Sequence, residues 1–183
     1  MVRDVKTDPC HLAYHDTEYG FPLRDDNELF QRLILEINQA GLSWTTILKK
    51  REGFRAAYAG FDIGKVAAFG DEDRKRLMAD ASIIRNRLKI NAAITNANTA
   101  LRLIGEYGSL AAWLDRLHPL TIGEWAKIFK KTFVFTGGEI VREFLLSTGY
   151  LRGAHEEDCP VYGQIAALSP PWCANQIHPP LLK

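Results

Sequence analysis

Apolar residues recur at helical spacing along most of this chain, in segments that begin at capping residues and end at glycine. The pattern is clearest over 25–41, where Asp25 and Glu28 match a capping box and Gly41 follows the last apolar residue. No convincing run alternates apolar and polar residues as a half-buried strand does. The spacing therefore predicts an all-α fold.

The same signals predict further helices along the chain. We expect Ser43 to cap the segment that carries Trp44, and helices over 61–70, 71–80 and 84–107, with another short segment after Ser109. Thr121 and Glu124 form a second predicted capping box. Residues 130–144 are predicted as helix, tight turn with paired glycines, and helix. Five prolines after Cys159 predict an irregular tail over 160–183.

Chain length and charge limit the class of protein. A chain of 183 residues fits one domain spanning 1–183. It has neither an apolar stretch of membrane-spanning length nor a signal-peptide h-region, which predicts a cytoplasmic protein with no membrane partner. The net charge of +1 means that nucleic-acid binding would rest on a local patch and backbone donors. No P-loop, dinucleotide fingerprint or Ser-His-Asp order is present, so phosphoryl and hydride transfer are unsupported.

Glu36 is the most informative single residue. It lies on the same predicted helix stripe as Leu29, Leu33 and Ala40, where an unpaired carboxylate is costly to bury. Such a group needs a partner, a raised pKa or a ligand. The alternative is a carboxylate at the edge of the stripe, solvated or paired with an arginine.

Aromatic residues flank Glu36 in the sequence, with Tyr14 and Tyr19 before it and Trp44 after it. Their faces near a carboxylate would suit a flat, cationic or electron-poor ligand. Trp44 can equally be an ordinary core residue, and periodicity does not decide between the two interpretations.

The 130–144 segment and several basic runs are candidate phosphate contacts. The turn with Gly137 and Gly138 would offer backbone N–H groups, and Lys130 and Lys131 would add charge. A packing hairpin is the alternative. The basic residues at 74–76 and at 85, 87 and 89 can also be solvated faces.

Metal binding is a further hypothesis. His155 and Cys159 have a spacing that allows two ligands from one turn, and His15 could add a third. A tetrahedral zinc site needs a fourth ligand, for which Cys10, Cys173 and His178 are available without a compelling spacing. Cysteines of a cytosolic chain otherwise stay reduced.

Several segments together resemble the 3-methyladenine DNA glycosylase I family. They are LAYHDTEYG at 12–20, LEINQAGLSWTTILKKREGFRAAY at 35–58, IIRNRLKI at 83–90, FVFTG at 133–137 and the His155/Cys159 pair. The resemblance implies a helix-hairpin-helix glycosylase fold with a base pocket between two helical layers. The implied function is a monofunctional glycosylase that flips 3-methyladenine out of double-stranded DNA and leaves an abasic site.

Site residues follow from the same resemblance by position. Glu36 would hydrogen-bond the extruded base and serve as the catalytic carboxylate, and the other implied base-binding residues are Tyr14, Trp44 and His11. The implied DNA-binding residues are Gln39, Gly41, Leu42, Lys130, Lys131, Thr136, Gly137 and Gly138. The implied zinc ligands are His15, His155 and Cys159, with Cys10 a candidate fourth. No organic cofactor and no obligate protein partner are implied.

The chain departs from the family pattern near its start. Val2 stands where the family has a cysteine ligand, and Asp4 and His11 stand where aromatic residues often line the pocket. The alternative from a different class of function is a non-catalytic binder of alkylated DNA on the same fold, and the retained Glu36, Tyr14 and Trp44 argue against it. A helical interaction module would not explain a carboxylate on this apolar stripe.

Overall fold

The computed structural model describes residues 8–174, and within that range the chain forms helices and no strands. The predicted all-α class is confirmed. The elements are α1 (Pro9–Thr17), α2 (Asp26–Gln39), α3 (Trp44–Lys49), α4 (Arg51–Ala57), η1 (Ala59–Phe61), α5 (Ile63–Ala67), α6 (Asp71–Ala79), α7 (Arg87–Tyr107), α8 (Leu110–Leu117), α9 (Ile122–Thr132), α10 (Gly138–Ser147), α11 (Tyr162–Ala167) and α12 (Pro171–Ala174).

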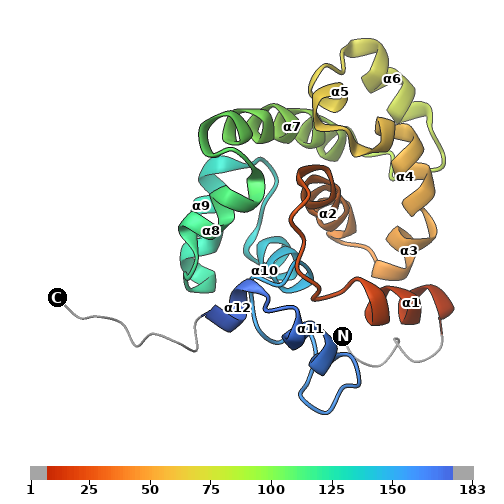
Figure 1. The fold of residues 1–183 in the computed structure, drawn as a ribbon. Coiled ribbons are helices and arrows are strands. Elements are labelled where there is room, and N and C mark those ends of the chain that lie inside the picture. Colours follow the sequence, from red (N-terminus) through yellow and green to blue (C-terminus); the bar gives the residue numbers. More distant parts are fainter. Residues whose placement is uncertain (1–7, 175–183) are drawn as a thin grey trace.

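Helix α2 lies at the centre of the fold, with α7, α8, α10 and α3 around it (Figure 1). Its buried residues run along nearly its whole length, from Leu29 to Asn38. A helix buried on almost every side is expected to be apolar all round, so the polar side chains that α2 does bury must serve a purpose beyond packing.

Most predicted helix boundaries are confirmed by the hydrogen bonds that form them. Asp25 accepts from the Glu28 N–H and Ser43 from the Thr46 N–H. The Thr121–Glu124 capping box has both of its reciprocal bonds, and Gly108 ends α7 at φ +89°. These local signals need no tertiary information, which is why the sequence predicts them.

Several boundaries differ from the prediction, and the helix expected over 61–70 is the shorter α5, Ile63–Ala67. Helix α7 starts at Arg87 and not near Ile84, because the Asn86 side chain accepts from the N–H groups of Leu88 and Lys89 and caps the helix there. In the turn before α10 the left-handed residue is Phe135, at φ +64°, whereas Gly137 is extended and caps α10. The predicted glycine turn was therefore wrong in its details.

The predicted irregular tail was also partly wrong. Within 160–174 the chain forms α11 and α12, and Val161, Ile165 and Trp172 make a small second apolar cluster. Pro171 opens α12, a position where its missing N–H removes no helix bond. Residues 175–183, with His178 and the last two prolines, lie outside the described range.

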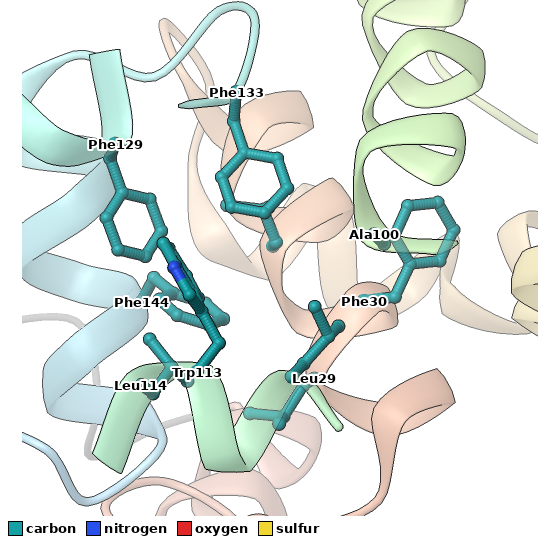
Figure 2. Close-up of a pocket in the computed structure, with 10 residues that line it drawn as sticks. Leu29, Phe30, Ala100, Trp113, Leu114, Phe129, Phe133 and Phe144 are labelled. Atoms are coloured by element: carbon teal, nitrogen blue, oxygen red, sulfur yellow. The ribbon is translucent and has the colours of Figure 1, made fainter. Parts of the chain in front are cut away.

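Aromatic rings from α8, α9, α10 and the turn before α10 fill one part of the main core. Figure 2 shows Trp113, Phe129 and Phe133 around a narrow void beside Leu29 of α2. The void measures about 10 Å³ and its lining is apolar, so it has room for one water molecule at most. It is a packing gap, far too small for a purine. Within residues 8–174, no helix has both the length and the apolar character needed to cross a membrane.

Candidate active site

Glu36 lies in the last turns of α2 and is 4% exposed. Within residues 8–174 its carboxyl group has neither a hydrogen-bond partner nor an ion pair with a basic side chain. The arginine pair is therefore wrong for the described structure, and the low exposure of Glu36 places it inside the stripe and not at its solvated edge. Burial raises the pKa of Glu36 to about 8, against the lowering effect of the Arg32 charge and with a smaller raising effect from Glu143.

Arg32 lies one helical turn before Glu36 and is also buried. Its guanidinium donates to the Tyr14 hydroxyl at 2.6 Å and to the Ser147 carbonyl at 3.3 Å. It also lies 3.5 Å from the Glu18 carboxylate, which pairs with Arg51 at 2.6 Å. No sequence signal pointed to this network, although the four-residue spacing between Arg32 and Glu36 places both on one helix face.

The three aromatic residues named from the sequence do form one cluster. Tyr14 lies 5.8 Å from Tyr19 and 5.2 Å from Trp44, measured between ring centroids. Trp44 is buried in the main core, and its Nε1–H is buried without an acceptor among the described residues. Tyr14 and Trp44 contact each other directly, so this arrangement leaves no room for a flat ligand between their rings. Insertion between them would need about 7 Å, twice a van der Waals contact.

A second carboxylate reaches this cluster from α10. The Tyr19 hydroxyl donates to Glu143 at 3.1 Å, and burial together with the Glu143 charge raises the pKa of Tyr19. No sequence signal distinguished Glu143, because its helix is far from α2 along the chain. His11, on α1, is partly exposed, and within the described residues its side chain has no hydrogen bond and no ring contact with the cluster.

His15, His155 and Cys159 come together at the end of α1. Their donor atoms all lie within 4.8 Å of one another, with Cys159 Sγ at 3.3 Å from His155 Nδ1 and 3.9 Å from His15 Nε2. We call them the His–His–Cys group. Cys10 and Cys173, although described, do not belong to it. Val2, the position aligned with the family's cysteine ligand, lies outside the described residues.

Hydrogen bonds behind the His–His–Cys group fix which ring nitrogens face it. His155 Nε2 lies 2.7 Å from the Tyr19 carbonyl, which can only accept, so Nε2 carries the proton. His15 Nδ1 lies 2.8 Å from the Asp16 carboxylate in the same way. In the neutral form of each ring, the nitrogen that faces Cys159 is the one without a proton. Burial lowers the pKa of His155, which favours this neutral form. Metal-binding histidines are commonly oriented by such outer bonds.

The 39–42 loop begins at the end of α2, three residues after Glu36. The Gln39 side chain donates to the Leu42 carbonyl at 2.9 Å, and Gly41 has φ +82°, which favours glycine. This geometry leaves the Leu42 side chain 38% exposed. An apolar side chain is thus presented to solvent by a closed, well-defined loop.

The predicted DNA-binding residues in and beside the 133–137 turn, which joins α9 and α10, differ in their exposure. Lys130 and Lys131 are exposed and form no ion pair within residues 8–174, and Gly137 and Gly138 are exposed. Thr136 is buried, and its hydroxyl donates to the carbonyls of Phe129 and Phe133. The Thr136 hydroxyl is therefore occupied inside the turn, and its main chain is the part available to a ligand.

The basic runs separate into two kinds. Arg74, Lys75 and Arg76 each pair with an acidic residue three positions earlier on α6. Arg85 and Arg87, just before and at the start of α7, are exposed, and the described part of the chain holds no ion-pair partner for them. The charges of Arg85 and Arg87 therefore remain available to an anion, whereas the three basic residues on α6 already have partners.

Comparison with known proteins gives consistent matches. The family model described as methyladenine glycosylase matches residues 4–122. The DNA-3-methyladenine glycosylase of Haemophilus influenzae is 35% identical over 82% of this chain and 91% of its own length. DNA-3-methyladenine glycosylase 1 of Escherichia coli is 52% identical over 54% of the chain, and the matched segment spans about half of that protein, 53%. A crystal structure of a 3-methyladenine DNA glycosylase I variant in complex with 3-methyladenine superposes with a TM-score of 0.78 at 34% identity, covering 85% of this chain and 93% of that one.

Proposed function

The chain belongs to the 3-methyladenine DNA glycosylase I family, and we propose that it is a monofunctional glycosylase of base excision repair that removes 3-methyladenine from alkylated double-stranded DNA. One observation carries the proposal. Glu36 is a buried carboxyl group without a partner in the described chain, next to a cluster of aromatic rings. Burial favours the protonated form of this carboxyl group, and the ionised form becomes stable only when a cationic ligand compensates its charge.

The proposed ligand is a cationic purine. Methylation at N3 places a positive charge on adenine, and a base of this kind attracts a carboxylate and stacks on tyrosine or tryptophan. Glu36 is proposed to hydrogen-bond the base edge, and Tyr14 and Trp44 to form the stacking wall. His11, one turn before Tyr14 on α1, is proposed to line the outer edge of the pocket. Neutral adenine lacks the charge, so it gains less from Glu36.

The bond chemistry needs little from the protein. The bond between N9 of the base and C1′ of the sugar breaks, and its electron pair neutralises the methylated base, which leaves without being protonated. Water adds to C1′ and gives up a proton to solvent, which leaves an abasic site. The protein therefore binds the extruded base and stabilises the charge that moves from base to sugar. Glu36 is the carboxylate placed to do so.

Duplex binding is proposed to use the 39–42 loop and the 133–137 turn. Leu42 is proposed to fill the gap left by the extruded base, held by Gln39 and Gly41. The exposed N–H groups of Gly137 and Gly138 and the main chain of Thr136 are suited to phosphate oxygens, and the unpaired charges of Lys130 and Lys131 support this surface.

We also propose that the His–His–Cys group holds a structural zinc ion. One thiol and two histidines with oriented ring nitrogens fit the donors that zinc prefers. A zinc ion there would tie the segment after α10 to α1 and take no part in bond cleavage. The proposed fourth zinc ligand is not one of the cysteines or histidines grouped within residues 8–174. The chain is further proposed to act in the cytoplasm as one domain spanning 1–183.

The proposal is tested by base release from DNA treated with a methylating agent. The wild type, supplied with zinc, should release 3-methyladenine, and Glu36→Ala should lose most of this activity. Glu28→Gln, an exposed acid on the same helix, is the matched control and should behave as wild type. Binding of methylated DNA without base release would instead identify a non-catalytic binder of alkylated DNA, and neither binding nor release would refute both functions.

A further inference from the structure

Lys89 occupies a position that packing alone does not explain. It lies in the first turn of α7 and is 5% exposed. The positive end of the helix dipole disfavours a cation in a first turn, and burial disfavours one further. Consistent with this, burial lowers the pKa of Lys89. A lysine kept at such a place must make interactions that outweigh both penalties.

Those interactions are with the end of α2. The Lys89 ammonium donates to the carbonyls of Asn38 and Ala40, both at 2.8 Å. The last carbonyls of a helix have no partner within the helix, and the negative end of its dipole favours a cation. Lys89 therefore caps α2 at the point where the 39–42 loop begins, three residues after Glu36.

The same ammonium also faces the 133–137 turn. It lies 6.0 Å from the centre of the Phe135 ring, and Phe135 is the left-handed residue of that turn. Two turns along α7, the buried Asn96 side chain both donates to and accepts from the Val134 main chain, at 3.0 Å and 2.7 Å. One face of α7 thus fixes the turn, and Lys89 links the turn to the loop.

We propose that Lys89 is a positioning residue for duplex DNA, which sets the spacing between the 39–42 loop and the 133–137 turn so that both meet one duplex. This inference rests on the proposed function. Lys89 itself is buried and does not contact phosphate. By holding both segments in place before binding, it removes the ordering that DNA would otherwise have to impose.

The test compares Lys89→Met with Lys65→Met, which removes an exposed lysine from α5. We expect Lys89→Met to weaken binding of a methylated duplex about ten- to a hundredfold, because the duplex must then order both segments itself. Affinity for free 3-methyladenine should stay within about twofold, because the base cluster is untouched. The salt dependence of duplex binding should keep the wild-type slope, since no phosphate contact is lost.

Lys89→Arg provides a second, milder variant in case Lys89→Met folds poorly. It keeps the charge but replaces a compact ammonium with a planar guanidinium, so duplex affinity should fall by less. Equal loss of duplex and free-base affinity, or unchanged duplex affinity, would overturn the proposal and leave Lys89 a structural residue. A wild type that binds duplex DNA but releases no base would refute the proposed function alone, and one that binds no duplex would refute both.

Discussion

Replacing Glu36 with glutamine should change how the stability of the free protein depends on pH. The folded-state pKa of Glu36 is raised to about 8 by burial, whereas the unfolded chain has the ordinary value of 4.5. Between these values the folded state holds a proton that the unfolded state has lost. Stability therefore falls as the pH rises through this range, the reverse of the usual carboxylate case.

The size of the effect follows from the two pKa values. The slope is about 1.4 kcal/mol per pH unit wherever the folded protein holds one more proton than the unfolded chain. From pH 5 to pH 9 the Glu36 contribution to the free energy of unfolding should drop by about 3 to 4 kcal/mol. Glutamine cannot ionise, so in Glu36→Gln this component disappears.

Urea unfolding at several pH values measures the effect directly. The difference in unfolding free energy between Glu36→Gln and wild type should grow in favour of the variant as the pH rises. Glu28→Gln removes an exposed carboxylate from the same helix and should show no comparable trend. A difference that stays flat from pH 5 to pH 9 would refute the reasoning, because it would mean that Glu36 is ionised without penalty at neutral pH.

Three further predictions concern other parts of the molecule. Lys130→Ala combined with Lys131→Ala should weaken duplex binding and reduce its salt slope by about 2. Arg74→Ala, which removes an ion-paired residue, should leave both the affinity and the slope unchanged. Binding isotherms that show the same loss of affinity for the double variant and for Arg74→Ala would contradict this prediction. Thr121→Ala should lower the free energy of unfolding by about 1 kcal/mol through loss of the cap, without changing affinity for free 3-methyladenine in calorimetry. Wild type should bind one zinc ion and lose thermal stability when a chelator is added, and Cys159→Ser should bind zinc weakly. A wild type that holds no metal and whose thermal stability is unchanged by the chelator would contradict the zinc site.

The helices could be predicted where a local signal marks their ends. Ser43 and Thr121 accept from the N–H groups three residues later, and Gly108 ends α7 in a left-handed conformation. The turn before α10 could not be predicted in the same way. There the left-handed residue is Phe135, and tertiary bonds from Asn96 to Val134 hold the strained turn. Periodicity carries no information about such long-range support.

The candidate site, like the helices, could be predicted from the sequence only in part. Helical spacing placed Glu36 on an apolar stripe, and the structure buries it there. Spacing could not show that Arg32, one turn away, would turn toward Tyr14 and Glu18 and leave Glu36 unpaired. That outcome depends on how α1 and the residues after it lie against α2, which helical periodicity does not specify. Which carboxylate stays unpaired is a tertiary property, and here it decides the chemistry.

Base selection and pH are linked through Glu36. A neutral base can bind while Glu36 keeps its proton, because burial already favours the uncharged form. A cationic base favours the ionised form, so below about pH 8 its binding must release a proton, and its affinity rises with pH until Glu36 is ionised in the free protein. Affinity for neutral adenine should not rise in this way. Discrimination between methylated and normal adenine should therefore increase from pH 6 to pH 8, and Glu36→Gln should abolish that increase while the pocket's shape is retained.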